Sequence, residues 1–172
     1  MPIVPDHKDW TWVLQRPCPE CGFDATAATP ATAPGIVASM LPRWRAALRR
    51  PDVADRPDAN TWSVLEYAGH VRDVFALFDH RLDLMVTEDD ARFEDWDQDL
   101  TAIEKDYANA DPAVVSAELT AEGTQIAASF ARVPEDEWGS KGTRSNGSEF
   151  TVLTFAQYFL HDVVHHLHDV DG

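Results

Sequence analysis

The chain has few basic residues. It carries 14 Lys and Arg against 30 Asp and Glu in 172 residues, which gives a formal net charge of −16. A surface of this sign repels the phosphates of nucleic acids and the headgroups of anionic lipids. We therefore expect neither nucleic acid nor a membrane surface as a partner.

Long apolar runs and cysteines are also scarce. No segment approaches the roughly 18 consecutive apolar residues that span a bilayer, and the first residues, "MPIVPDHKDWTW", lack the basic and apolar regions of a signal peptide. Cys18 and Cys21 are the only two cysteines, too few for a disulfide framework, and they fit a reducing compartment. We expect a cytoplasmic protein.

Strand signals are rare, whereas helix signals occur in four places. Ser63 followed three residues later by Glu66 forms a capping box, and Asp111 before Pro112 marks another start. In the first apolar segment Pro42 predicts a kink or a late start. The four predicted helices cover residues 36–48, 63–86, 111–133 and 151–170.

These helices predict an all-α fold, an up-down-type four-helix bundle with one long crossover connection. The crossover is the acidic stretch 87–110, with a short helix in its second half, and residues 138–152 form a hairpin or loop before the last helix. We expect an irregular N-terminal arm over residues 1–33, which contains "CPEC" and packs on the body, and the bundle over 34–172.

Four of the seven histidines lie in "HDVVHHLHDV", residues 161–170. At about 100° per residue, His161, His165 and His168 share one helical face, while His166 points roughly 100° away. The i, i+4 spacing lets His161 and His165 meet at one metal ion. His70, in the second predicted helix, is a candidate third ligand, and three imidazoles with an open position suit a catalytic metal.

A role without a metal stays open for these histidines. Histidines near a helix C-terminus also complement the helix dipole in solvent, and this explanation fits His166 and His168. We therefore expect His166 to be a bystander. His168 is either another bystander or a reserve ligand. Asp162 points about 100° away from His161 and is a less suitable ligand. His80 is expected to be solvated.

Two carboxylates accompany His70 on roughly the same helical face. Glu66 and Asp73 are candidates for holding its second ring nitrogen or for moving a proton. The alternative is that they are ordinary cap and surface carboxylates.

The cysteine pair has the C-x-x-C spacing of zinc half-sites and of redox dithiols. The chain has no second C-x-x-C motif, so a zinc site would need His7 or a carboxylate as a further ligand. Cys18 and Cys21 therefore form a separate zinc pair, a redox pair, or a structural pair without chemistry.

The segments "TWSVLEYAGHVRDV" and "FTVLTFAQYFLHDVVHHLHDV" resemble the DinB/YfiT-like superfamily of metal-dependent four-helix bundles, over about residues 34–172. In that superfamily a histidine of the second helix and an H-x-x-x-H pair of the last helix bind a divalent metal. The resemblance therefore implies His70, His161 and His165 as metal ligands. We expect a divalent metal there, Zn before Ni, Fe or Mn.

The resemblance also implies an activity. Members of the superfamily include thiol S-transferases that use mycothiol or bacillithiol, so we expect a metal-dependent S-transferase of the actinobacterial type, acting on a mycothiol-like thiol and a small electrophile. Arg72, Arg81 and Arg144 are candidates for binding a carboxylate of the thiol. The alternative is a non-catalytic metal-binding or stress-associated bundle, and a homodimer stays open.

Overall fold

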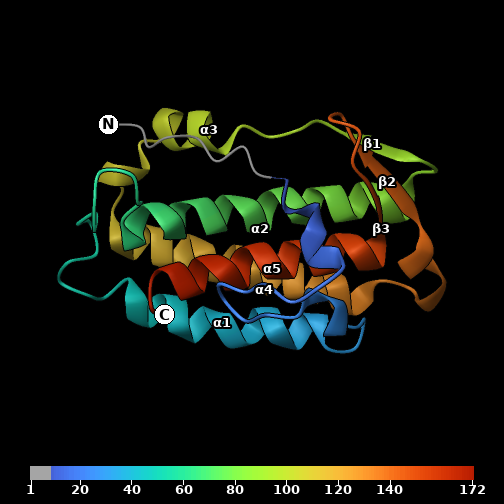
Figure 1. Cartoon of the computed structure of the whole chain (residues 1–172), viewed down its shortest axis with the longest axis horizontal. Helices are drawn as coiled ribbons and strands as arrows, with labels where there is room; N and C mark the ends of the chain where they lie inside the picture. The colour runs from blue at the N-terminus through green and yellow to red at the C-terminus, as the bar shows by residue number, and fades with distance from the viewer. Residues whose placement is uncertain (1–8) are drawn as a thin grey trace.

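The computed structural model describes residues 9–172, so the candidate ligand His7 lies outside the described residues. The structure is mostly helical and confirms the predicted four-helix bundle (Figure 1). Its long helices are α1 (Ala33–Ala47), α2 (Val64–Thr87), α4 (Pro112–Arg132) and α5 (Val152–Asp169). The shorter ones are α3 (Gln98–Glu104) and the 3₁₀ turns η1 (Trp10–Leu14), η2 (Ala25–Ala27), η3 (Tyr107–Asn109) and η4 (Glu135–Gly139).

Helix α1 does not pack mainly against α2, the next long helix in the chain, nor does α4 pack mainly against α5. Helix α4 packs against α1 and α2, and α5 packs against the same two helices, so α1 and α2 lie diagonally opposite, as do α4 and α5 (Figure 1). The crossover runs back along the bundle and makes α2 and α4 parallel (Figure 1). Helix α5 therefore has one flank toward α2 and another toward α1 and the arm.

The predicted start signals are all present. The Ser63 hydroxyl accepts a hydrogen bond from the Glu66 N–H, and the Glu66 carboxylate accepts one from the Ser63 N–H. The Trp62 and Tyr67 rings meet edge to face at 5.5 Å across this cap. Asp111 caps α4 with Pro112 in its first turn.

The expected effect of Pro42 on the first helix was partly wrong. Helix α1 begins at Ala33 and continues through Pro42, so it does not start late. Pro42 itself is exposed, while Met40, Leu41 and Trp44 are buried in the core. Tertiary packing of the buried face thus offsets the hydrogen bond that proline removes.

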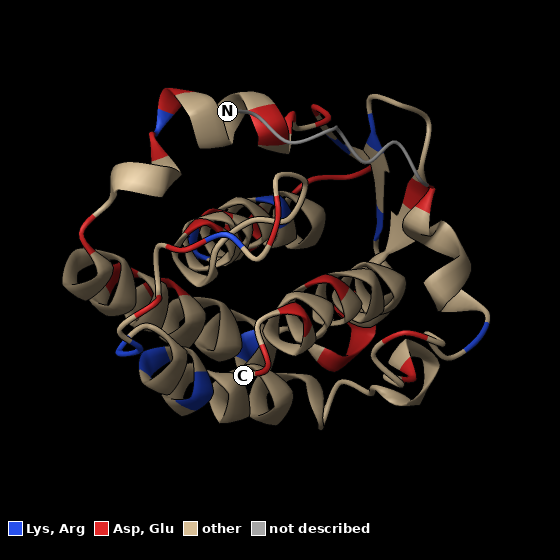
Figure 2. Cartoon of the chain, turned by 60° about the vertical axis from the view of Figure 1, so that its left-hand side comes forward, with Lys and Arg blue, Asp and Glu red and all other residues tan. Residues whose placement is uncertain are grey.

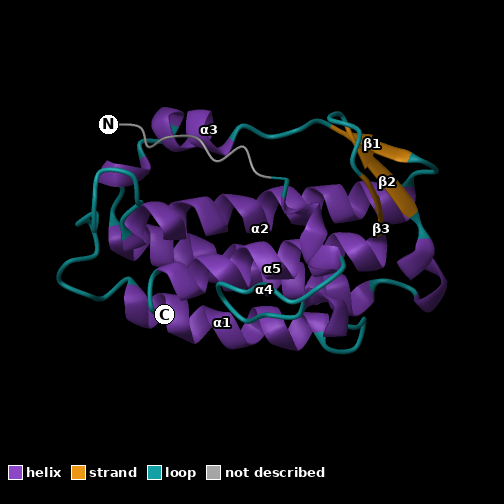
Figure 3. Cartoon of the chain, viewed as in Figure 1, coloured by secondary structure: helices purple, strands orange, loops and turns teal. Residues whose placement is uncertain are grey.

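A small sheet covers the end of the bundle at which α5 begins (Figure 3). Its strands are β1 (Ala91–Phe93), β2 (Lys141–Arg144) and β3 (Glu149–Thr151), in the order β1-β2-β3, with β1 parallel to β2 and β2 antiparallel to β3. The β2–β3 hairpin confirms one of the two predictions for residues 138–152. A Cβ at Gly142 would lie 2.8 Å from the Met85 side chain, so glycine lets β2 approach the end of α2.

The described part of the arm, from residue 9 on, packs on α5, as predicted. Both η1 and η2 contact α5, and Val13, Cys18 and Ala25 are buried there. The side-chain amide of Gln157 on α5 donates to the carbonyl oxygen of Ala28 at 3.0 Å. The arm therefore contributes to the environment of the last helix.

The charges follow the composition. Acidic residues lie on helices and loops around the molecule, and basic ones are few (Figure 2). Arg50, just beyond α1, donates to the carbonyl oxygens of Val170 and Asp171 at the C-terminal end of α5, where a cation favours the helix dipole. None of the helices described between residues 9 and 172 combines the length and apolar character of a membrane-spanning segment.

Candidate metal centre

Helix α5 carries two potential ligand pairs that are offset by one residue, so they lie on different flanks. Each pair belongs to a group whose ligand atoms all lie within 4.8 Å of one another. The α2-side group consists of His70, Asp162 and His166. The arm-side group consists of Cys18, Cys21, His161 and His165.

The α2-side group joins helix α2 to helix α5. The Nε2 atom of His70 lies 3.8 Å from Oδ2 of Asp162, and Nε2 of His166 lies 3.7 Å from Oδ1 of Asp162. The His70 and His166 rings meet edge to face, with centroids 4.8 Å apart. Two nitrogens and a carboxylate oxygen thus converge from two helices.

Several of these atoms lack hydrogen-bond partners. Within residues 9–172, neither ring nitrogen of His70 nor Oδ2 of Asp162 makes a hydrogen bond, although these atoms are buried. Buried polar atoms are normally paired, and an unpaired one calls for an explanation such as a bound ion. A histidine–histidine–carboxylate set is one that Zn²⁺ and related divalent ions accept, so the residues fit a metal.

The charge states suit a cation. Burial lowers the pKa of His70, which leaves its ring neutral. Burial acts to raise the pKa of Asp162, but His166 and His70 outweigh it and hold this pKa at about 2. Burial likewise acts against the charged form of His166, yet Asp162 and Asp169 raise its pKa. A cation would take the place of the His166 proton beside Asp162.

Neighbouring side chains fix the rings. Asp169 lies 3.0 Å from Nδ1 of His166, which leaves Nε2 facing Asp162; a carboxylate behind a ligating histidine commonly orients it in this way. Trp96, from the crossover, stacks on His70 with ring centroids 5.4 Å apart. Trp62 packs against the same ring at 5.5 Å.

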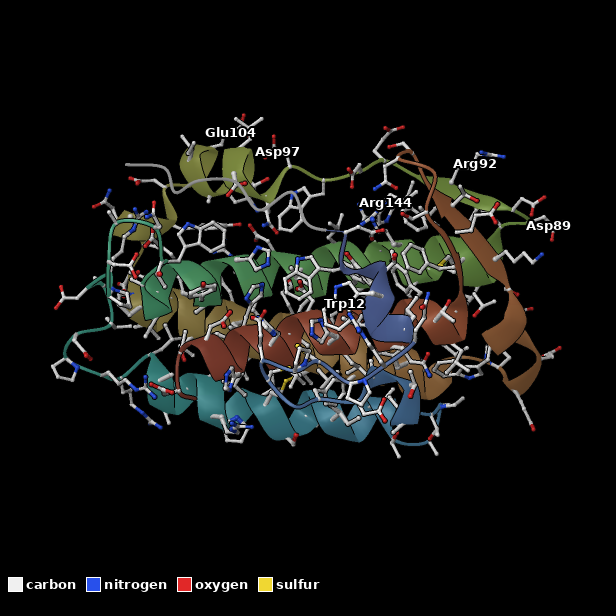
Figure 4. The ribbon with its side chains drawn as sticks, viewed as in Figure 1. Trp12, Asp89, Arg92, Asp97, Glu104 and Arg144 are labelled. Atoms are coloured by element: carbon white, nitrogen blue, oxygen red, sulfur yellow. The ribbon has the colours of Figure 1, made fainter. Side chains whose placement is uncertain are left out.

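A cleft of about 1360 Å³ opens beside Asp162 and His166. Its walls come from the arm, the crossover, the small sheet and α5. Its acidic lining residues are Asp9, Glu20, Asp95, Asp97, Asp99, Glu149, Asp162 and Asp169, and of the described Lys and Arg residues only Arg144 joins them. Arg144 lies over the same face of the bundle as Trp12 (Figure 4) and pairs with Asp95 at 3.5 Å. The cleft is therefore strongly anionic.

The arm-side group lies on the other flank of α5. Cys18 Sγ is 3.7 Å from Nδ1 of His165, and the His161 and His165 rings are 5.2 Å apart. Burial, followed by the charge of His165, lowers the pKa of His161 to about 4. Burial raises the pKa of the Cys21 thiol.

Comparison with known proteins agrees with the fold. The sequence profile of the DinB superfamily matches residues 41–170. The chain belongs to the DinB superfamily. No curated protein matches its sequence.

One solved structure with the same fold is YfiT from Bacillus subtilis. It superposes with a TM-score of 0.72 at 16% identity, over 83% of this chain and 85% of that one. YfiT is described as "a probable metal-dependent hydrolase with an unusual four-helix bundle topology". At this identity the likeness shows a shared fold.

The structure divides the histidines of this DinB-superfamily chain differently from the sequence prediction. His70, His161 and His165 are all buried, but only the last two lie together, and His70 lies with Asp162 and His166. The three histidines predicted as one ligand set therefore do not meet at a single point in this structure. Their joint role as metal ligands stays a prediction. His166, predicted as a bystander, has its ring in the α2-side group, so whether it binds a metal stays open.

The i, i+4 spacing rule applies to both pairs on α5. Asp162 and His166 are also four residues apart, but the helical pattern gives only relative directions and not the flank that faces α2. From the sequence alone, His161 and His165 are therefore the more obvious metal ligands, because both members of that pair are histidines. His168 is exposed and belongs to neither group.

The remaining predicted residues have other partners. Glu66 pairs with Arg56 and caps α2, and Asp73 accepts hydrogen bonds from Arg72 and Tyr107. Neither carboxylate makes a hydrogen bond to a ring nitrogen of His70. Glu66 and Asp73 therefore act in a helix cap and in ion pairs, which was the alternative expected from the sequence. His80 is exposed, as expected.

Proposed function

We propose that the chain is a metal-dependent enzyme that holds a divalent ion at the α2-side group and transfers a low-molecular-weight thiol to an electrophile. The observation that carries the proposal is the set of buried atoms of His70 and Asp162 that have no hydrogen-bond partner in the described part of the chain, next to the cleft that Asp162 and His166 line. The superfamily and the description of YfiT add support for metal dependence.

Three protein ligands leave a coordination position open, which is typical of catalytic sites. A divalent ion there supplies Lewis acidity that lowers the pKa of a thiol or water at the open position. We favour Zn, with Ni, Fe or Mn as alternatives. Asp169 keeps the His166 ring oriented, and the Trp62 and Trp96 rings keep water from His70.

The charge of the cleft favours an uncharged thiol. Carboxylates on a thiol cosubstrate would meet the acidic lining at close range. Of the three arginines expected to bind a carboxylate, Arg72 is held by Asp73 and Glu118, and Arg81 is buried and donates to the Glu94 carbonyl. Arg144 alone lines the cleft. A neutral, sugar-bearing thiol such as mycothiol fits better than anionic bacillithiol.

The opposite wall favours an apolar electrophile. Leu100 and Ile103 of α3 are 50% and 57% exposed and line the cleft together with Trp96. In the transfer, the thiol sulfur forms a bond to the electrophilic carbon, the leaving group departs with its electron pair, and the thiol proton passes to solvent. The aromatic and aliphatic wall would bind the carbon skeleton during this exchange.

Metal content tests the ligand assignment. We would purify the protein without added metal and measure bound metal by elemental analysis, in a Cys18→Ser/Cys21→Ser background that removes the thiols of the other group. His70→Ala and His166→Ala are expected to lose one ion per chain. The matched control is His80→Ala, an exposed histidine on the same helix as His70.

Conjugation of monochlorobimane tests the reaction. With the metal-loaded protein we expect a rate above background with mycothiol, a lower rate with bacillithiol, and loss of the rate in His70→Ala but not in His80→Ala. Bound metal without conjugation of any thiol contradicts S-transfer and favours the non-catalytic bundle. Thiol-independent ester hydrolysis would instead favour a hydrolase, as described for YfiT.

A further inference from the structure

The arm-side group brings together two short motifs from opposite ends of the chain. The C-x-x-C pair lies in the arm and the H-x-x-x-H pair on α5, and 147 positions separate Cys18 from His165. Cys18 is 1% exposed, His161 4% and His165 8%. This cluster is not used by the α2-side group or by the proposed reaction.

The backbone of the arm turns both thiols toward α5. The Cys18 N–H donates to the Phe23 carbonyl at 2.9 Å, and the Gly22 N–H donates to the Cys18 carbonyl at 2.9 Å. Gly22 has a φ of 73°, a left-handed conformation that glycine adopts without steric cost. The two cysteines therefore lie on one tight turn, with their sulfurs close to both imidazoles.

The imidazoles are arranged as metal ligands. The Nδ1 atom of His165 faces Cys18 Sγ, while its Nε2 atom lies 3.6 Å from a carboxylate oxygen of Glu20 and 3.6 Å from one of Asp169. Ligating histidines typically present one nitrogen to the metal and the other to a carboxylate. The Nε2 atom of His161 is buried and has no hydrogen-bond partner in the described part of the chain.

We propose that the arm-side group binds one Zn²⁺ ion as a closed, four-ligand Cys₂His₂ site. Around a tetrahedral zinc, ligand atoms lie about 3.3–3.8 Å apart, and the present separations of at most 4.8 Å need only a small contraction. Two thiolates and two imidazoles complete the coordination, so no position stays open for a substrate. This proposal does not depend on the proposed function.

The ion would fasten the arm to the last helix. Trp10, in η1, packs on both His161 and His165, with ring centroids 5.5 and 5.3 Å away, and it also lines the cleft. A zinc ion would therefore hold a wall of the cleft in place while taking no part in the chemistry. The complete site uses His161 and His165 from α5, instead of His7 or a carboxylate, as the partners of the cysteine pair.

Cobalt substitution tests this assignment on the intact chain. Co²⁺ bound by two thiolates in a tetrahedral site gives sulfur-to-metal charge-transfer bands and intense visible bands. We expect these in the wild-type protein, and expect Cys18→Ser/Cys21→Ser to abolish them with the loss of one zinc per chain. His70→Ala and His168→Ala should retain both, which separates this site from the α2-side group.

Thiol accessibility provides a second measurement that needs no variant. With zinc bound, both thiols should resist a disulfide reagent such as DTNB, and a chelator should expose two thiols per chain; circular dichroism verifies that helices persist. Zinc content unchanged by Cys18→Ser/Cys21→Ser, or cobalt spectra without thiolate bands, would overturn the proposal. A Cys18–Cys21 disulfide in protein purified anaerobically would overturn it as well.

Discussion

The two flanks of α5 use the same helical spacing with different donors. Both groups reach the anionic cleft, the α2-side group through Asp162 and His166 and the arm-side group through His161 and His165. The α2-side group offers two histidines and a carboxylate, whereas the arm-side group adds the two cysteines of a tight turn to its two histidines. Three ligands leave room for a reactant, while four ligands that include thiolates form a closed site. The number and type of donors thus separate a candidate reaction centre from a candidate structural one.

The largest expected effect concerns the stability of the arm-side group. Removing its ion with Cys18→Ser/Cys21→Ser opens a cross-link over 147 positions, and by analogy with cross-links over such loops we expect a loss of about 4–5 kcal/mol in the free energy of unfolding. Urea denaturation of zinc-loaded proteins measures it. A loss equal to that caused by His168→Ala would contradict a structural ion.

The next largest effect separates the two flanks by activity. His166→Ala should lower the conjugation rate by more than about 100-fold because a metal ligand is lost, while His165→Ala should cost less than about 10-fold because it acts through the cleft wall. Steady-state kinetics with matched metal loading measures both. The reverse order would restore the predicted set of His70, His161 and His165.

The local signals in the sequence predicted the helices well. Caps such as Ser63 with Glu66, and Asp111 with Pro112, depend on hydrogen bonds within a few residues, so they can be recognised without tertiary information. Strand β1 was not predicted because it is three residues long and is paired through distant β2. Short pairings of this kind leave little periodicity in a sequence.

The site was predictable only in part. The sequence indicated that α5 and His70 carry metal-binding potential, and that the cysteine pair has the spacing of half a zinc site. It did not indicate that Asp162 and His166 face α2, because helical periodicity gives angles between residues but not the orientation of the helix in the bundle. The docking of the arm on α5 joins His165 to Cys18 across the chain, and tertiary packing decides such contacts.

Asp169 contacts both flanks of α5, so its substitution should have an intermediate effect on metal affinity. One of its carboxylate oxygens lies 3.0 Å from Nδ1 of His166 and the other 3.6 Å from Nε2 of His165. We expect Asp169→Asn to weaken metal binding at both groups by about 10–100-fold. Competition with a chromogenic chelator measures each affinity in proteins that carry only one group. Weakening at a single group would show that the carboxylate serves that flank alone.

The smallest effect concerns Asp73, which lies outside both groups. Burial acts to raise its pKa, but Arg72, Tyr107 and Lys105 outweigh burial and lower the pKa of this carboxyl below its usual value. A lowered pKa in the folded state stabilises the fold above the unfolded pKa of about 4, and this stability is lost as the pH falls through the lower, folded-state pKa.

Asp73→Asn should therefore cost about 1–2 kcal/mol at neutral pH and reduce the loss of stability on acidification, without changing metal content. Urea denaturation at pH 7 and in acid, together with elemental analysis, checks both expectations. Loss of metal in Asp73→Asn, with the fold intact by circular dichroism, would restore Asp73 as a partner of His70. Retention of metal would instead support a role of the Asp73 carboxylate in packing α2 against η3, through Tyr107, and not in holding His70.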